Sequence, residues 1–341
     1  MFKLRLALAT FAVSFSVGII HAATLPNGVV YSANEGDGSI SEITLRTGDV
    51  RTTQITVVPH NVQISPDGKV ILAVGTSKPE SGGHDEHGGA DHHGEGGVLI
   101  LDVNQMDNAP DLLPSGEHPA HIVTNPDGRY AYITNADSDR VSVVDIQNKE
   151  IAAEIPTGAY PHGLRLGPDG RELYVANVAD NSVSVINTES LTEEVRIPVG
   201  KAPVQLAFTS DGEQVYVSLR DENSVAIIDV TDRKVINRIS VGRGPIQLFA
   251  AAGKMYVANE GTEAEPDNTV SVIDIKSQSI LETVVTGNGA HGVVASDDGN
   301  FVFVTNTTDN TVSAINTNSQ SVVATYSVGP NPNGITYRSA P

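Results

Sequence analysis

Histidine is the residue type in this chain that could carry metal or acid–base chemistry. The 341 residues include ten histidines and three methionines but no cysteine, which excludes disulfides, thiolate metal sites and cysteine nucleophiles. Imidazole is a good ligand for copper(II), zinc and nickel, whereas copper(I) prefers sulfur ligands that are scarce here. An imidazole could also act as a general base, because it titrates near neutral pH.

Four of the histidines lie in a polar segment, residues 76–97. After Ser81 this segment contains only Gly, His, Asp and Glu apart from Ala90. It cannot bury apolar area, and a tract of this composition is typical of metal binding. We therefore predict a metal-binding loop with loose, exchangeable geometry, and a solvated loop without a ligand is the alternative. Its candidate ligands are His84, His87, His92 and His93.

Five of the other six histidines belong to a repeated sequence; the sixth, His21, lies in the N-terminal segment. The repeat is marked by a proline or alanine, mostly at intervals of 42 residues, at Pro119, Pro161, Pro203, Pro245, Ala290 and Pro332. Each period holds four short runs with strand-like alternation, separated by turns such as Pro168-Asp169-Gly170, and no helical pattern. Four strands in about 42 residues are typical of one propeller blade.

Counting the repeats predicts seven blades. Complete units begin near Val58, Glu117, Ala159, Lys201, Arg243 and Asn288. The remaining strands come from both ends of the chain, at Val29–Asn34, Ser39–Ile43, Thr52–Val57 and Asn333–Tyr337. A blade shared by the two termini removes the open sheet edges that a linear array would expose. We therefore predict an all-β, seven-bladed propeller that forms a single domain over residues 23–341.

The second strands of the blades carry a further pattern. They read Tyr132-Ile133-Thr134-Asn135, Tyr174-Val175-Ala176-Asn177, Tyr256-Val257-Ala258-Asn259 and Phe303-Val304-Thr305-Asn306. These repeats resemble the YVTN family of β-propellers over roughly residues 29–338, and they lack the tryptophan of WD repeats. The resemblance implies the fold but not one function, since it covers exported proteins of unknown role, surface-layer proteins, lactonase-like enzymes and the propellers of denitrification enzymes.

Propeller geometry predicts that the histidines share one face. If the first strand of each blade is innermost and starts at the top, all nine histidines after His21 lie on that face. The ring positions are His60, His121, His162 and His291, with Asn333 on the shared blade and Gln205 and Gln247 on the other two blades. This predicts a metal or ligand site at the mouth of a central channel, beneath the His-rich loop. The alternative is that Pro-His is a common dipeptide of this repeat family and that the imidazoles form hydrogen bonds with the neighbouring backbone.

The N-terminal segment has the layout of a secretory signal peptide. A basic start precedes the apolar run Leu6–Ile20 and the small-residue site His21-Ala22-Ala23, so we predict cleavage after residue 22. The run is shorter than a membrane span needs, and without cysteine a lipoprotein anchor is excluded. The expected location is the periplasm or the outside of the cell. Removal of Lys3 and Arg5 would take the formal charge from −20 to −22, which argues against nucleic acid and anionic membrane surfaces as partners.

Three functions are consistent with these features. The leading hypothesis is an exported propeller that binds or handles copper, zinc or nickel at its His-lined face. The second is a lactonase-like hydrolase or lyase acting on a small molecule at the same mouth, and the third is a scaffold for another exported protein. No G-x-S-x-G elbow, Walker loop or dinucleotide fingerprint occurs in the sequence, so no catalytic residue is assigned. Arg165, Arg220 and Arg243 are candidates for anion contacts near the channel, with surface roles as the alternative.

Overall fold

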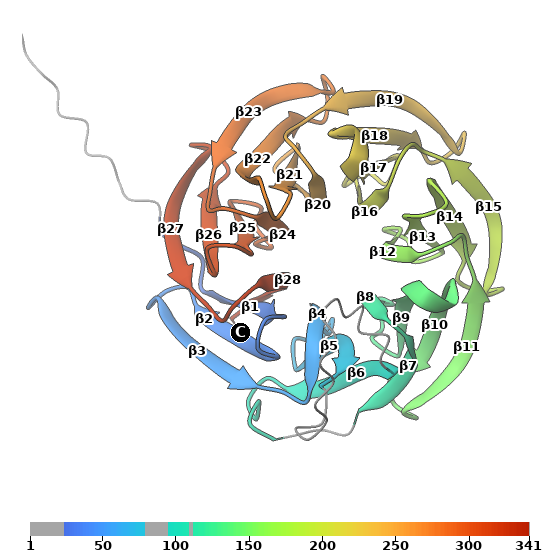
Figure 1. Ribbon diagram of the computed structural model, residues 1–341, viewed down its shortest axis with the longest axis horizontal. Helices are drawn as coiled ribbons and strands as arrows, with labels where there is room; N and C mark the ends of the chain where they lie inside the picture. Colours follow the sequence, from blue (N-terminus) through green and yellow to red (C-terminus); the bar gives the residue numbers. More distant parts are fainter. Residues whose placement is uncertain (1–23, 79–94, 109–111, 341) are drawn as a thin grey trace, which may run out of the picture.

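Seven antiparallel four-stranded sheets form a ring about a central axis (Figure 1). The computed structural model describes residues 24–78, 95–108 and 112–340. The predicted all-β, seven-bladed fold is confirmed. The expected signal peptide and the four histidines of the His-rich loop lie outside the described residues.

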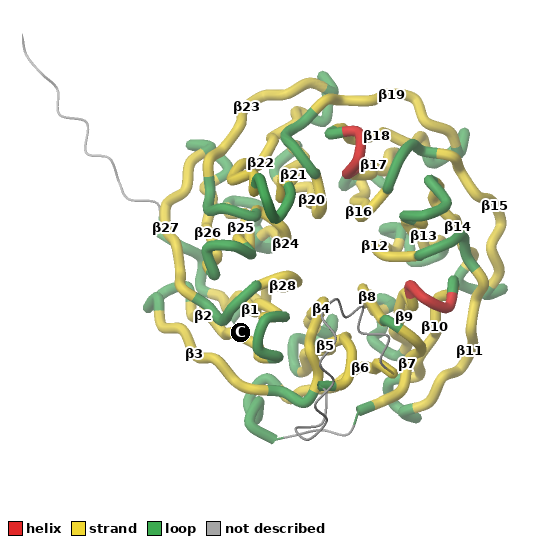
Figure 2. The backbone as a smooth tube through the Cα atoms, viewed as in Figure 1, coloured by secondary structure: helices red, strands yellow, loops and turns green. Residues whose placement is uncertain are grey.

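Each blade places one strand at the axis and its fourth strand at the rim (Figure 1). The innermost strands of blades 1 to 7 are β28 (Pro332–Ser339), β4 (Val57–Ile64), β8 (Pro119–Thr124), β12 (Pro161–Leu166), β16 (Pro203–Phe208), β20 (Pro245–Ala251) and β24 (Ala290–Ala295). The second strands are β1 (Gly28–Asn34), β5 (Val70–Ser77), β9 (Tyr130–Asn135), β13 (Glu172–Asn177), β17 (Gln214–Leu219), β21 (Lys254–Gly261) and β25 (Phe301–Asn306). The third strands are β2 (Ser39–Thr44), β6 (Glu95–Asp102), β10 (Arg140–Asp145), β14 (Ser182–Asn187), β18 (Ser224–Asp229), β22 (Pro266–Asp274) and β26 (Thr311–Asn316). The outer strands are β3 (Asp49–Gln54), β7 (Leu113–Glu117), β11 (Glu150–Pro156), β15 (Thr192–Pro198), β19 (Lys234–Ser240), β23 (Ser279–Val285) and β27 (Ser321–Ser327). Two short 3-10 helices, η1 (Ala136–Ser138) and η2 (Arg220–Glu222), lie between second and third strands (Figure 2).

The core lies between neighbouring blades. The middle strands are buried on both faces, as in β13, whereas outer strands such as β15 alternate between exposed and less exposed residues. Tyr174 of blade 4, for example, packs in one cluster with Leu206 and Val217 of blade 5. This pattern explains why the inner strands are rich in β-branched and aromatic residues, which fit a sheet covered on both sides.

The asparagine that ends the YVTN-like phrase has a structural role. The Asn177 amide is fully buried and donates hydrogen bonds to the hydroxyls of Ser182 and Ser184 at 3.0 and 2.8 Å. Equivalent amide-to-hydroxyl pairs tie the second strand to the third in blades 1, 6 and 7. In these four blades the asparagine therefore closes the hairpin between the second and third strands.

The termini complete blade 1, where β28 pairs with β1. One predicted boundary is wrong: the outer strand of this blade spans Asp49–Gln54 rather than Thr52–Val57. Gly48 has a φ of 79°, which lets the chain turn at once after β2 and pair Asp49 with Thr44. Val57 instead begins β4 and pairs with Ser77.

Candidate metal site at the channel mouth

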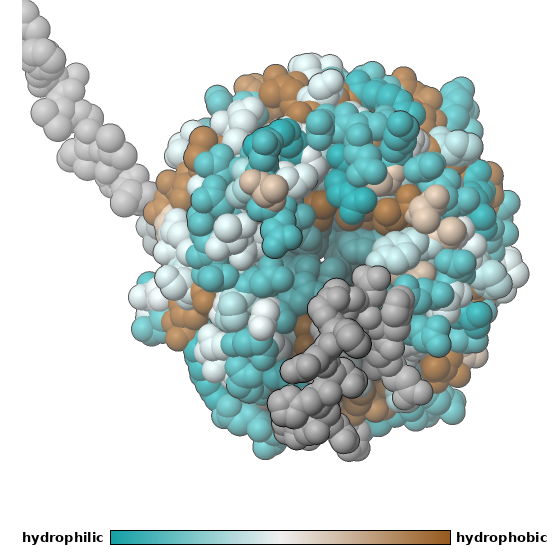
Figure 3. All heavy atoms as spheres, viewed as in Figure 1, coloured by the Kyte–Doolittle hydropathy of each residue, from teal (hydrophilic) through white to brown (hydrophobic). Residues whose placement is uncertain are grey.

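A β-bulge at the start of every innermost strand turns side chains toward the mouth. In blade 4, Pro161 pairs with Asn177 and Leu164 with Val175, so β12 carries one extra residue. The same irregularity occurs in the other six blades. A bulge breaks the strict alternation of side chains, so positions one and two residues after the proline can both line the axis. The face in Figure 3 is hollowed at its centre, and the residues around the hollow are mostly hydrophilic.

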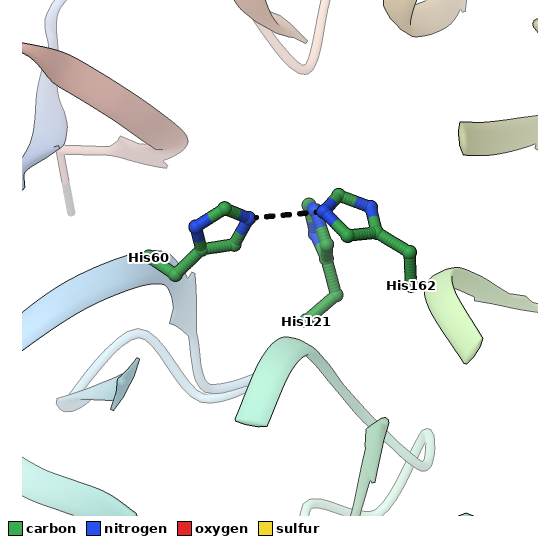
Figure 4. A group of neighbouring side chains, drawn as sticks. All are labelled: His60, His121 and His162. Carbon is green, nitrogen blue, oxygen red and sulfur yellow. Dashed lines mark hydrogen bonds between the residues drawn. The ribbon is translucent and has the colours of Figure 1, made fainter. Parts of the chain in front are cut away.

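Three histidines from three consecutive blades converge there (Figure 4). His60 lies on β4, His121 on β8 and His162 on β12, and one ring nitrogen from each lies within 4.8 Å of the others. Nε2 of His60 and Nε2 of His162 are 3.1 Å apart. Metal–nitrogen bonds of about 2.1 Å in a tetrahedral site place ligand nitrogens about 3.4 Å apart. Small side-chain rotations would therefore bring the three rings, which we call the His triad, around one ion.

Outer hydrogen bonds orient two rings of the triad for ligation. Nδ1 of His60 donates to Oε1 of Glu35 at 3.2 Å, and Nδ1 of His162 donates to the Val204 carbonyl at 3.3 Å. With Nδ1 as the donor, Nε2 of each ring is directed to the shared space. Metal-bound histidines commonly have this arrangement, with the second ring nitrogen held by a carboxylate or a backbone carbonyl.

His121 is held differently. Its side chain is fully buried, and Nδ1 accepts a hydrogen bond from Nε2 of Gln205 at 3.3 Å. The proton of the neutral ring is then on Nε2, which is buried and has no hydrogen-bond partner among the described residues. Buried polar atoms without a partner are rare and call for an explanation. Ligation by this atom requires the proton to move to Nδ1, with the Gln205 amide turned to accept it.

The pKa values of the three triad histidines shift in different directions. Burial alone disfavours the charged form of Glu35, but the charge and hydrogen bond of His60 outweigh it and lower the Glu35 pKa to about 2. For His60 burial is likewise outweighed by Glu35, and its pKa is raised above 6.5. Burial, followed by the neighbouring imidazoles, lowers the pKa values of His121 and His162 well below 6.5. Glu35 thus favours a proton on His60, whereas burial favours the neutral forms of His121 and His162.

The fourth ring histidine does not join the triad. His291 on β24 is buried, its Nε2 lies 4.0 Å from Oε1 of Glu260, and its Nδ1 has no hydrogen-bond partner within the described part of the chain. Asn333 on β28 donates to Oε2 of Glu35 at 2.8 Å, so it supports the carboxylate that holds His60. Gln247 is buried on β20, and its Nε2 is likewise without a partner in the described ranges.

Glu35 and Glu260 are candidate site residues that the repeat register did not reveal. Both directly follow a buried asparagine of a second strand, and both stand in an Asn-Glu-Gly sequence, Asn34-Glu35-Gly36 and Asn259-Glu260-Gly261. The other blades have no glutamate at this position. A comparison of the seven repeats at this position could therefore have identified the two acidic partners of the ring histidines.

Fold and site together define the class: a seven-bladed β-propeller whose innermost strands place histidines and amides at one mouth, beside two carboxylates at the ends of second strands. The model of the YNCE-like beta-propeller family matches residues 111–254. This match confirms the predicted resemblance to YVTN-type β-propellers for this part of the chain. No curated protein matches the sequence.

Solved structures share the propeller fold at low sequence identity. Hydrazine synthase from Kuenenia stuttgartiensis is 19% identical with a TM-score of 0.66, covering 83% of this chain and 95% of that chain. A putative 6-phosphogluconolactonase from Bacteroides fragilis is 15% identical with a TM-score of 0.71, covering 93% and 99%. The dihydro-heme d1 dehydrogenase NirN is 12% identical with a TM-score of 0.65, covering 93% and 76%. At these identities the likeness shows the fold alone.

Proposed function

We propose that this chain is an exported β-propeller that binds one divalent transition metal at the His triad. The observation that carries the proposal is the convergence of His60, His121 and His162, with ring nitrogens within 4.8 Å of one another. Three imidazoles suit copper(II), zinc and nickel. The site of zinc enzymes with three histidines uses the same donor set and leaves a further position open for water or a ligand.

The surroundings of the triad favour a cation. Glu35 contacts His60 directly, and Glu260 lies beside His291 at the same mouth. Two carboxylates near three ligands supply negative charge that compensates a divalent ion. Glu35 also raises the pKa of His60, so a metal ion at the triad would compete with a proton on this ring.

Export and handling are parts of the same proposal. The basic start, apolar run and small-residue site of the first 22 residues favour secretion, and N-terminal sequencing of protein from the periplasm or medium tests this. The His-rich loop, residues 76–97, leaves blade 2, which also carries His60. We propose that the loop captures metal and passes it to the triad. Its partners are then the metal ion and a small molecule or another exported protein, and not nucleic acid.

Metal analysis separates this proposal from the enzyme and scaffold hypotheses. The protein is produced without a histidine tag, purified without an immobilised-metal column and dialysed against a chelator. Retention of about one copper, zinc or nickel ion per chain supports the proposal. Metal-free protein that takes up none of the three ions contradicts it, and hydrolysis of lactones or binding of an exported partner then becomes the better explanation of the mouth.

A further inference from the structure

Arg165 lies on the wall of the channel below the triad. It follows His162 by three residues on β12, which corresponds to about 10 Å along the strand. Leu164, the residue before it, packs into the core between blades 3 and 4. Arg165 is partly exposed, and its Nη1 donates to the carbonyl oxygen of Leu164 at 3.1 Å.

The direction of that carbonyl places the guanidinium. The Gly167 amide donates to the Glu172 carbonyl at 2.8 Å, so residues 167 and 172 form a hydrogen-bonded pair of the antiparallel ladder. Hydrogen-bonded and non-hydrogen-bonded pairs alternate, so the pair Leu164–Val175 is of the second kind. The Leu164 carbonyl therefore points away from β13. Because β12 is the innermost strand, the carbonyl and the guanidinium bound to it face the central axis.

Arg165 has no acidic partner in the described part of the chain. Of the other three partly exposed arginines in the described residues, two are paired with acids, Arg140 with Glu154 and Arg233 with Glu194. Burial lowers the pKa of Arg165 to about 10, and the side chain stays charged at neutral pH. A half-buried cation without a counter-charge is costly, and it is unusual in a chain with 41 acidic and 21 basic residues. An anion supplied from solution would compensate it.

We infer that Arg165 binds a small carboxylate anion in the channel, which also coordinates the metal ion held by the His triad. The metal half of this inference depends on the proposed function. The guanidinium has five N–H donors and uses one for Leu164, so a planar carboxylate can still bind two in parallel. The positive charge of Arg165 also acts on His121, after burial and the two neighbouring imidazoles, which places it within electrostatic reach of the triad. A ligand with two oxygens can then fill the open coordination position of the metal ion and also accept hydrogen bonds from the Arg165 guanidinium.

Acetate is a suitable probe, and Arg165→Gln and Arg165→Lys are the variants. Arg171→Gln is the matched control, because Arg171 lies on the same blade and is highly exposed. Its Nε lies 3.9 Å from Oδ2 of Asp169. Metal per chain and the circular dichroism spectrum are recorded for each protein first. Acetate binding is then measured by isothermal titration calorimetry with the metal-free and the metal-loaded forms.

We expect Arg165→Gln to bind acetate at least about tenfold more weakly than wild type in both forms, at unchanged metal content. Arg165→Lys keeps the positive charge but lacks the paired N–H donors of the guanidinium, so its acetate affinity should be intermediate. Arg171→Gln should bind acetate as wild type does. Equal acetate affinity of wild type and Arg165→Gln, or no acetate binding by wild type, overturns the inference. If the proposed function is wrong, wild type will bind no metal. The acetate titration of the metal-free protein still tests the role of Arg165 in that case.

Discussion

Nε2 of His60 lies 3.1 Å from Nε2 of His162, although the two residues are 102 positions apart and belong to blades that are not neighbours. Both rings use Nδ1 as a donor, His60 to Glu35 and His162 to the Val204 carbonyl. For this contact to be a hydrogen bond, one of the two Nε2 atoms must carry a proton. Glu35 raises the pKa of His60 against the effect of burial, which favours that proton on His60. A metal ion that binds here competes with this proton.

Replacement of Glu35 should move the pH dependence of metal binding. Glu35 raises the pKa of His60 against the opposing effect of burial, so Glu35→Gln lets His60 lose its proton at lower pH. The pH at which half the sites are filled, at fixed metal concentration, should fall relative to wild type. Glu282→Gln, an equal charge change on the exposed outer strand β23, should leave it in place. An unchanged midpoint in Glu35→Gln would show that the His60 proton does not control binding.

Gln205→Glu should strengthen metal binding. In the wild type the Gln205 amide donates to Nδ1 of His121. If Nε2 of His121 binds the metal, Nδ1 must carry the ring proton and needs an acceptor instead of a donor. A carboxylate at this position accepts that proton and should raise metal affinity about tenfold. Gln247→Glu is the control, since it adds the same charge at the equivalent position of the next blade. If both variants gain equally by competition titration, the gain is only electrostatic and His121 is not a ligand.

The metal-free protein should lose stability as the pH falls below about 6.5. Burial lowers the pKa values of His121 and His162, so the unfolded chain takes up protons that the folded chain excludes, and each group contributes up to about 1.4 kcal/mol per pH unit. His60 has the opposite sign, since its raised pKa adds stability below 6.5 that is lost as the pH rises through the folded value. Urea unfolding at pH 7, 6 and 5 measures the slope. The double variant His121→Asn, His162→Asn should have a flatter slope, and an equally steep one would contradict these pKa directions.

The YVTN-like asparagines should be important for stability. Asn177→Ala removes two buried hydrogen bonds and leaves the hydroxyls of Ser182 and Ser184 without this donor, so the free energy of unfolding should fall by about 2 kcal/mol. Asn300, between β24 and β25, is exposed, and its side-chain amide donates to Asp298. Asn300→Ala should therefore change the free energy by less than about 0.5 kcal/mol. Equal losses in the two variants, measured by denaturant unfolding, would remove the proposed difference between buried and exposed asparagines.

Much of the fold follows from the sequence because each blade repeats the same alternation and turn residues. The error at the outer strand of blade 1 arose because residues 52–57 cross the boundary between β3 and β4 without a glycine or proline to mark it. Only the Gly48 turn fixes the pairing of β3 with β2. Register within the repeat also identified which residues reach the mouth, since the bulge occurs in all seven blades.

Convergence of particular rings could not be predicted in the same way. Register gives His60, His121, His162 and His291 similar heights, but which rings meet depends on their rotamers and on nearby acceptors. Glu260 lies beside His291, whereas Glu35, Asn333 and Val204 orient the rings of blades 2 and 4 toward each other. Close approach of blade 5 also depends on Gly163, where a Cβ would lie 2.4 Å from the Val204 carbonyl oxygen.

The metal content of a loop-deleted protein tests the central claim most directly. A chain lacking residues 82–94 is produced without a tag, loaded with zinc or copper(II), dialysed against a chelator and analysed by mass spectrometry of the metal. It is compared with the same chain carrying His60→Ala, His121→Ala and His162→Ala, and with one carrying His291→Ala alone. We predict about one ion per chain for the loop-deleted protein and for His291→Ala, and almost none for the triad variant. An empty loop-deleted protein, or a triad variant that retains as much metal, would contradict a metal site at the channel mouth.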